Sequence, residues 1–363
     1  KVRVKGYKHI RAWGDTPNKS MRISANNSVK QLKEAHNGRL PTNIYALAIS
    51  GGGADGAFGA GLLSGWTQSG KRPQFHLVSG ISTGALIAPF AFLGPKYDGQ
   101  LKTLYTTITD EKIYKVNDPI SLLSAFVSPV LNRSIVSNKP MKKIMRKIVN
   151  KSMIDEIAKE HLKGRRLFIG TSQVNAERLV IWDIGAIAAS GNPGSVKLIR
   201  KILLASSAIP GVFPPEYFDV EAGGKSYQEM HFDGGIETQV MLYEKSITPF
   251  SKCFIKQSNP PHAKLYIIRN RKVTPEWSNL KPRLHYIVDR AISTLTKNQG
   301  IGDLYRLYAV SLRDKIEYNL AYIPESFSYE ANSPFDTKYM KHLFSEGEKV
   351  GKIGIWKKRP PGI

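Results

Sequence analysis

The feature that most constrains this chain is a strand, turn and helix pattern that occurs twice in succession. Asn43–Ser50 (NIYALAIS) is a short apolar run that ends at three glycines, Gly51–Gly53, and Ala57–Thr67 continues with small and apolar residues. Phe75–Ser79 and Thr83–Phe92 repeat the order of strand and helix. Because parallel strands need such crossovers, the pattern predicts a parallel sheet with helices on its faces.

Later segments extend this sheet, so we expect an α/β protein of three layers, α/β/α, with a mostly parallel central sheet. Residues 1–40 hold ten basic and two acidic residues with little periodicity, which predicts an extended basic N-terminal arm. Residues 41–325 are expected to form the main domain, with a helical insertion at about 95–163, and residues 326–363 a C-terminal extension. Further strands are expected at Arg166–Gln173, Arg178–Asp183, Met230–Phe232 and Lys264–Arg269, and helices at Ser195–Ser207 and within Arg283–Tyr318.

Composition narrows the classes of partner. With 53 Lys and Arg against 29 Asp and Glu, the net charge of +24 favours anionic partners such as nucleic acid or acidic phospholipid headgroups. No zinc-finger spacing or RNA-binding aromatic motif occurs, so nucleic acid is not expected. No apolar stretch reaches the roughly 18–20 residues that span a bilayer. Cys253 alone excludes a disulfide framework and a cysteine-rich zinc site, and no ligand cluster implies a metal or cofactor.

The sequence leaves the location and the oligomeric state open. The first residue is Lys1 rather than Met, which is compatible with a signal or lipid-anchor segment removed upstream. An exported or membrane-associated bacterial-type location and a cytoplasmic one both agree with a single cysteine.

The residues Gly80-Ile81-Ser82-Thr83-Gly84 carry the strongest chemical signal. They fit G-x-S-x-G between a predicted strand and a predicted helix, which is the context of a nucleophile elbow. The glycines are needed because a sharp turn brings neighbouring backbone too close for a Cβ. The next helix begins with partly positive amides that favour developing negative charge. Ser82 is therefore a candidate nucleophile, and an ordinary Gly/Ser turn is the structural alternative.

The run Gly51-Gly52-Gly53-Ala54-Asp55-Gly56 has two functional interpretations. The N–H groups of successive glycines can form an oxyanion hole for an ester carbonyl. The same residues match G-x-G-x-x-G of dinucleotide-binding proteins, but that motif needs an acid about 20 residues further on. No Asp or Glu occurs between Asp55 and Asp98, which weakens this second interpretation. A tight turn for close helix packing would also use these glycines.

A base that activates Ser82 must come from elsewhere in the chain. Asp233 ends a short apolar run and precedes two glycines, so its carboxylate is a candidate, although Asp-Gly turns are common. Histidine is the competing base. His231 is the most interesting, because it lies two positions before Asp233 and so on the same strand face. The other histidines downstream of Ser82 are His161, His262, His285 and His342.

Four segments resemble, in the same order, those of the patatin-like phospholipase family: Gly51–Gly56, Gly80–Gly84, Ala205–Pro215 (ASSAIPGVFPP) and Asp233-Gly234-Gly235. The resemblance covers roughly residues 43–240. It implies a patatin-like fold, a Ser–Asp dyad with Ser82 as nucleophile and Asp233 as base, and an oxyanion hole formed by the amides of Gly51, Gly52 and Gly53. Many members have Arg or Lys where Asp55 stands, and this departure bears on the loop and on substrate choice.

The segment Lys139–Lys151 (KPMKKIMRKIVNK) has six basic and no acidic residues, and its apolar residues recur at helical spacing. Such a helix either packs its apolar face on the protein, which we favour, or lies on an anionic membrane.

We therefore expect a serine-dependent lipid acyl hydrolase of phospholipase A or lysophospholipase type. It would act on phospholipid or lysophospholipid through an acyl-Ser82 intermediate, with peripheral contact to an anionic membrane and without a cofactor. A carboxylesterase for small soluble esters, a non-catalytic lipid-binding relative and a dinucleotide-binding protein that uses the glycine-rich loop are the alternatives.

Overall fold

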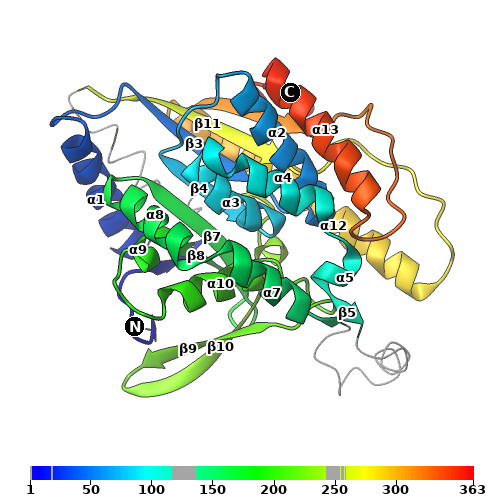
Figure 1. The fold of residues 1–363 in the computed structure, drawn as a ribbon, viewed down its shortest axis with the longest axis horizontal. Coiled ribbons are helices and arrows are strands. Elements are labelled where there is room, and N and C mark those ends of the chain that lie inside the picture. The colour runs from blue at the N-terminus through cyan, green and yellow to red at the C-terminus, as the bar shows by residue number, and fades with distance from the viewer. Residues whose placement is uncertain (1, 18, 117–135, 243–253, 255–256, 258) are drawn as a thin grey trace.

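The structure is a computed structural model that describes residues 2–17, 19–116, 136–242, 254, 257 and 259–363. Its main sheet runs in the order β1-β9-β10-β7-β4-β3-β11-β12, and β8 and β2 branch from β7 (Figure 1). The five strands from β7 to β12 are parallel, and antiparallel strands extend the β7 side. The strands are β1 Arg3–Val4, β2 Arg11–Trp13, β3 Asn43–Ile49, β4 Leu77–Ile81, β7 Arg166–Gln173, β8 Arg178–Asp183, β9 Glu216–Ala222, β10 Lys225–Asp233, β11 His262–Arg269 and β12 Glu317–Tyr322; the short pair β5 Lys115–Val116 and β6 Val136–Ser137 stands apart.

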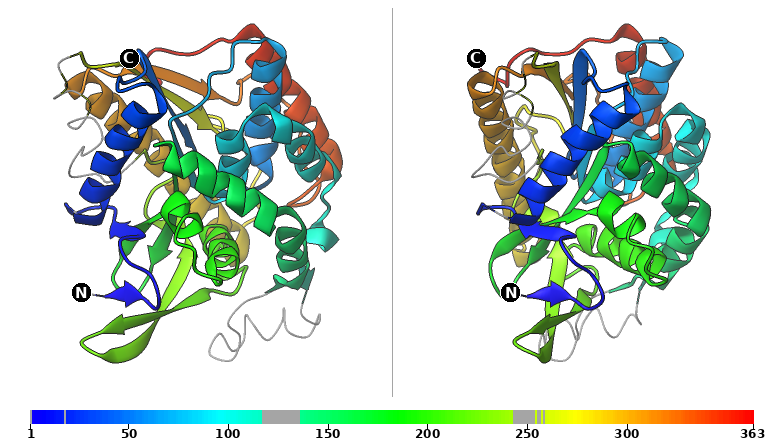
Figure 2. Two further views of the ribbon diagram at one scale, coloured as in Figure 1. Left: turned by 60° about the vertical axis from the view of Figure 1, so that its left-hand side comes forward. Right: turned by 90° about the vertical axis from the view of Figure 1, so that its left-hand side faces the viewer.

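Helices cover both faces of this sheet, as the right-hand view of Figure 2 shows. Golden α12 lies on one side, and the cyan, green and red helices lie on the other. The predicted three-layer α/β fold with a mostly parallel central sheet is therefore confirmed. The helices are α1 Lys19–Ala35, α2 Gly56–Gln68, α3 Thr83–Leu93, α4 Asp98–Thr107, α5 Asp110–Ile113, α7 Lys139–Ile148, α8 Lys151–Leu162, α9 Ile184–Ala188, α10 Ser195–Ser206, α12 Leu284–Arg313 and α13 Thr337–Ile353.

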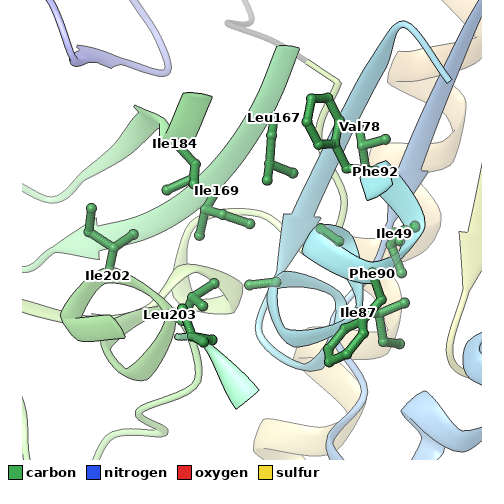
Figure 3. Close-up of a cluster of buried hydrophobic side chains, with 14 of the residues drawn as sticks. Ile49, Val78, Ile87, Phe90, Phe92, Leu167, Ile169, Ile184, Ile202 and Leu203 are labelled. Atoms are coloured by element: carbon green, nitrogen blue, oxygen red, sulfur yellow. The ribbon is translucent and has the colours of Figure 1, made fainter. Parts of the chain in front are cut away.

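Successive residues of a central strand point to opposite faces of the sheet, so their side chains lie in two separate cores. On β7, Leu167 and Ile169 face the core under α3, α9 and α10, whereas Phe168 faces the core under α1 and α12. Leu47 and Ala48 of β3 divide in the same way. Figure 3 shows the first core, where side chains of β4 and β7 meet those of α3 and α10. Burial on both faces is what holds the central strands in place for the site at their ends.

The C-terminal α13 packs closely on α2 because glycines line the contact. A Cβ on Gly61 would lie 2.0 Å from the Phe344 carbonyl oxygen, and one on Gly347 would lie 2.1 Å from that of Phe58. Small residues allow two helix backbones to approach this closely. The segment predicted as a C-terminal extension is therefore packed into the main body of the fold.

One sequence prediction needs correction. Residues 1–40 are not an extended arm, because they contain the 17-residue helix α1 and the strands β1 and β2, which pair with β9 and β8. The helix α1 buries Met21 and Ala25 against the sheet, and its Leu32 is buried as well. The prediction of helix within Arg283–Tyr318 is confirmed, because the single long helix α12 occupies Leu284–Arg313, and β12 begins at Glu317. Cys253 and part of the predicted insertion lie outside the described residues.

Candidate active site

The register of β7 brings Ser82 and Asp233 together. Two strands pair with β7 one after the other. The pairing with β4 ends where Ile81 lies opposite Gly170, and the pairing with β10 begins at the next residue of β7, where Asp233 lies opposite Thr171. The residue after β4 therefore meets the last residue of β10, although they are 151 positions apart. Glycines permit this junction, since a Cβ on Gly234 would lie 2.7 Å from the Gly170 carbonyl oxygen.

Ser82 sits at a sharp turn between β4 and α3. Its φ of 55° lies in the left-handed region, which is uncommon for a residue with a Cβ. The flanking glycines are required by the backbone around them. A Cβ on Gly80 would lie 2.3 Å from the Gly84 carbonyl oxygen, and one on Gly84 would lie 2.3 Å from that of Ile49. The Ser82 N–H donates to Ser206 Oγ at 3.1 Å, and Ser206 Oγ donates to the Gly170 carbonyl, which ties the turn to β7.

The Ser82 hydroxyl donates a hydrogen bond to Asp233 Oδ2 at 2.6 Å. The other carboxylate oxygen, Oδ1, accepts the Gly235 N–H at 2.7 Å. Burial raises the pKa of Asp233 to about 7, and these two hydrogen bonds oppose the rise. Near neutral pH, the carboxylate is therefore a stronger base than an exposed aspartate and is in contact with the hydroxyl that it would deprotonate.

The glycine-rich loop lies beside this pair and differs in one respect from the sequence prediction. The Gly51 N–H donates to the Gln239 carbonyl at 3.0 Å, so it is not available to an oxyanion and this residue leaves the predicted set. Within the described part of the chain, the N–H groups of Gly52 and Gly53 have no acceptor. Gly53 has a φ of 58° and lines the cavity that contains Ser82.

Asn270, which follows β11, holds the glycine loop in place and was not predicted from the sequence. Its N–H donates to Ser50 Oγ at 2.8 Å, its Nδ2 donates to the Ser50 carbonyl at 2.9 Å, and its Oδ1 accepts the Gly59 N–H. A Cβ on Gly52 would lie 2.2 Å from the Asn270 carbonyl oxygen, so only glycine fits there. No local motif marks Asn270, because its role depends on β11 lying next to β3.

Asp55, at the end of the glycine loop, faces α13. The Tyr339 hydroxyl donates to Asp55 Oδ1 at 2.6 Å. Burial raises the pKa of Asp55, and the hydrogen bond from Tyr339 and the charge of Arg271 oppose this rise. Asp55 was noted in the sequence as an acidic residue at a position where Arg or Lys is common. In the structure its side chain joins the glycine loop to the C-terminal helix α13.

A narrow cavity of about 70 Å³ opens next to Ser82 and is mostly apolar. Its walls come from α3, α4, α5, α7 and the segment that follows α10, with a contribution from the C-terminal part of the chain. The lining includes Leu86, Leu104, Tyr105, Ile108, Ile113, Met141, Ile209, Phe213, Phe335 and Met340. Met141 and Met145 of α7 are buried, which agrees with the favoured prediction that the apolar face of this basic helix packs on the protein.

No histidine side chain among the described residues is hydrogen-bonded to Ser82. His231 is fully buried, and its Nδ1 contacts Thr171 Oγ1 at 2.8 Å while its Nε2 contacts Glu229 Oε2 at 3.2 Å. His161 lies 3.7 Å from the Asp183 carboxylate, and His342 stacks on Tyr329. Both ring nitrogens of His231 are thus engaged away from the Ser82 hydroxyl.

Two features are absent from the described residues. These residues contain no cluster of three or more His, Cys, Asp or Glu that could hold a metal ion. Among the helices in the same part of the chain, none combines the length and the apolar character needed to cross a membrane.

Fold and site together define an α/β protein with a serine–aspartate pair at the carboxyl end of a central parallel strand. The patatin-like phospholipase family profile matches residues 47–241, which is more than half of the chain. The chain therefore belongs to the patatin-like phospholipase family, as the sequence motifs predicted.

The other comparisons add little. The crystal structure of VipD from Legionella pneumophila aligns with a TM-score of 0.42 and 13% sequence identity. The alignment covers 86% of this chain and 66% of that one, so this chain spans slightly less than two thirds of VipD. A similarity of this size says nothing about function. No curated protein matches the sequence.

Proposed function

We propose that this protein is a lipid acyl hydrolase of phospholipase A or lysophospholipase type that uses Ser82 and Asp233 as a catalytic dyad. The observation that carries the proposal is the 2.6 Å hydrogen bond from Ser82 Oγ to Asp233 Oδ2 beside an apolar cavity. An apolar cavity suits an acyl chain better than a small polar ester.

In the proposed reaction, Ser82 Oγ attacks the ester carbonyl carbon and its proton passes to Asp233. The N–H groups of Gly52 and Gly53 donate to the oxyanion that forms. The ester C–O bond then breaks, the proton moves from Asp233 to the leaving alkoxide, and an acyl-Ser82 remains. Water attacks this acyl group and gives a proton to Asp233. Collapse of the second tetrahedral intermediate releases the fatty acid and returns the proton to Ser82.

Membrane contact is part of the same proposal, because phospholipid substrates reside in bilayers. The net charge of +24 favours anionic surfaces. The basic helix α7 offers its exposed Lys139, Lys143 and Lys147 for electrostatic contact, but its Met141 and Met145 are buried. Any apolar side chains that insert into the bilayer must therefore belong to another surface of the protein.

The proposal is tested by mass spectrometry of the products that the chain releases from a mixed phospholipid and lysophospholipid extract. We expect fatty acid release that Ser82→Ala and Asp233→Asn both abolish, whereas Ser190→Ala, a matched serine substitution outside the site, retains it. Hydrolysis of short soluble esters without any release from lipids would instead favour the carboxylesterase alternative. Survival of activity in Ser82→Ala would refute the dyad.

A fluorophosphonate separates the hydrolase from the two non-hydrolytic alternatives. The reagent loses fluoride as its phosphorus bonds to an activated serine oxygen, so we expect one covalent label, at Ser82. If the unsubstituted chain is not labelled, the result would favour a lipid-binding or dinucleotide-binding protein.

A further inference from the structure

The stretch from residue 277 to residue 295 exposes an unusual number of large apolar side chains. It precedes and includes the first turns of α12, and Trp277 is 96% exposed. Of the twenty exposed large hydrophobic side chains in the described part of the chain, eight lie here: Trp277, Leu280, Leu284, Tyr286, Ile287, Val288, Ile292 and Leu295. We call these eight residues the α12 apolar surface. An exposed apolar patch of this kind indicates an interaction site.

A series of contacts connects the α12 apolar surface to the rim of the candidate active site. One turn after Leu295, or about 6 Å along the helix, Gln299 Nε2 donates to the Ile236 carbonyl at 3.0 Å. Ile236 is itself exposed and lies three residues after Asp233, whose N–H donates to the Ala208 carbonyl. Ile209, which follows Ala208 in the chain, is exposed and lines the cavity that contains Ser82. In Figure 1 the golden α12 extends away from the sheet at the right-hand side, where this surface lies.

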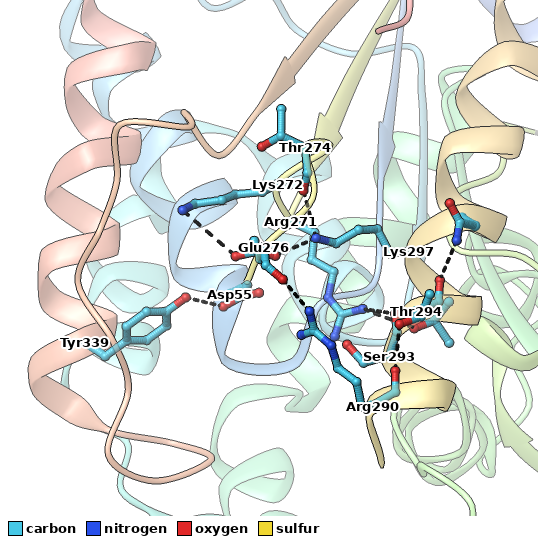
Figure 4. Close-up of polar contacts among 12 residues, drawn as sticks. Asp55, Arg271, Lys272, Thr274, Glu276, Arg290, Ser293, Thr294, Lys297 and Tyr339 are labelled. Atoms are coloured by element: carbon cyan, nitrogen blue, oxygen red, sulfur yellow. Dashed lines mark hydrogen bonds and ion pairs between the residues drawn. The ribbon is translucent and has the colours of Figure 1, made fainter. Parts of the chain in front are cut away.

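Basic groups gather beside the same helix. A cavity of about 400 Å³ is lined by Arg271, Lys272, Arg290 and Lys297, with Asp55 and Glu276 as the acidic residues (Figure 4). Lys297 pairs with Glu276 at 2.6 Å, and Lys272 lies 3.9 Å from the same carboxylate.

Neither arginine of this cavity forms an ion pair with a carboxylate among the described residues, although the charge of Arg271 acts on the buried Asp55. Arg271 donates to Thr296 Oγ1 at 3.1 Å, and Arg290 donates to the Glu276 carbonyl. Their remaining N–H donors can bind phosphate oxygens in pairs, since arginine matches phosphate geometry and stays charged at any physiological pH. Positive charge next to an apolar helix complements an anionic lipid surface.

We propose that the α12 apolar surface docks onto an anionic phospholipid bilayer, with Arg271 and Arg290 bound to lipid phosphates at its edge. This inference rests on the proposed function, because docking would bring the mouth of the Ser82 cavity to the substrate layer. Trp277 and Tyr286 fit the role, since their rings favour the membrane interface. A bilayer suits the combination of apolar and basic groups better than a second copy of this chain, which carries the same positive charge.

The test uses the Ser82→Ala chain, which leaves lipids intact, and measures sedimentation with two kinds of vesicle. One is phosphatidylcholine alone and the other also contains phosphatidylserine. We expect binding that is strongest to the anionic vesicles and weakens with salt. The triple change Leu284→Asp/Ile292→Asp/Leu295→Asp should reduce vesicle affinity by about 100-fold or more. Arg271→Gln/Arg290→Gln should reduce binding to the anionic vesicles alone, by about 10-fold.

The matched control carries Leu162→Asp/Leu312→Asp/Ile353→Asp, three comparably exposed apolar positions outside the surface, and should bind like the parent. Circular dichroism checks that each variant folds. Equal vesicle binding by both triple variants would overturn the proposal. So would a dimer of the parent chain that the first triple change dissociates while vesicle binding is absent.

Failure of the docking proposal and failure of the proposed function can be told apart. Binding is measured without catalysis, so vesicle binding without lipid hydrolysis by the Ser82 chain would leave docking intact and refute the hydrolase. Conversely, a chain that retains Ser82 and carries the triple change Leu284→Asp/Ile292→Asp/Leu295→Asp should hydrolyse short soluble esters normally and lose activity on vesicles.

Discussion

Asp233→Asn separates the chemical role of the carboxylate from its effect on stability. In the folded chain burial raises the pKa of Asp233 to about 7, whereas an unfolded aspartate has the value 3.8. The folded state therefore prefers the protonated acid. Stability conferred by this residue is fully present below pH 3.8 and is lost as the pH rises towards about 7. At about 1.4 kcal/mol for each pKa unit, the loss amounts to about 4 kcal/mol at pH 8.

Asparagine has nearly the shape of the protonated acid and no charge to bury. We therefore expect the free energy of unfolding of Asp233→Asn, relative to the unsubstituted chain, to rise by about 4 kcal/mol between pH 4 and pH 8. Urea unfolding at several pH values measures both proteins, and all other titrating groups cancel in the difference. Asp98→Asn serves as the control, because Asp98 is paired with Arg72 and lies away from the site.

Activity should move in the opposite direction. Asparagine cannot accept the Ser82 proton, so fluorophosphonate labelling of Ser82 should slow by about 100- to 10,000-fold. In the unsubstituted chain the labelling rate should rise with pH around a midpoint near 7, with about one tenth of its maximum at pH 6. A rate that is flat from pH 5 to pH 8, or a pH-independent stability difference, would refute this reasoning about the buried carboxylate.

Three further predictions concern the scaffold. Gly52→Ala places a Cβ 2.2 Å from the Asn270 carbonyl oxygen, so the loop must shift and Ser82 labelling should slow by about 100-fold or more; an unchanged rate would remove this loop from the oxyanion hole. Asn270→Ala should lower kcat by about 10-fold and the free energy of unfolding by about 1–3 kcal/mol, while the pH midpoint of labelling stays near 7, as expected for a positioning residue. Gly61→Ala should lower the melting temperature because α13 leaves no room, whereas Gly302→Ala on α12, with nothing within 4 Å, should raise it slightly; similar shifts for both would contradict the packing argument.

The central strands and the turn at Ser82 were predictable because their signals are local. An apolar run that ends in glycines marks β3 and β4, and G-x-S-x-G specifies the turn at Ser82 through steric needs of the backbone itself. Asp233 alone resembles a common turn. Only the combination with the other family motifs distinguished it from the five histidines that compete for the role of base.

The helix α1 escaped prediction because its buried stripe is partly polar. Ser24 and Ser28 take core positions alongside Met21 and Leu32, which weakens the apolar periodicity. Tertiary hydrogen bonds make this tolerable, since Ser24 donates to Asp183 and Ser28 donates to the Gly164 carbonyl. None of these partners is near in sequence, so no pattern within residues 1–40 could reveal them.

The same limit applies to the glycine loop. Three glycines in a row predict exposed amides, but which amide stays free depends on neighbours that arrive from distant strands. Gln239 takes the Gly51 N–H, and Asn270 fixes Ser50 and Gly59 around it. These contacts appear only once the sheet order is known.

The carboxyl edge of β4 and β7 concentrates features that the fold does not favour by themselves. Ser82 has a positive φ, Asp233 is a buried carboxylate, and Gly52 and Gly53 have amides without acceptors in the described chain. Each of these is unfavourable alone, and the proposed reaction would relieve the last two. The carboxylate takes up a proton, and the free amides gain an oxyanion. Two cores, one on each face of the sheet, pack the strands that lead to this edge, so the carboxylate and the amides are already in place for the proposed substrate carbonyl.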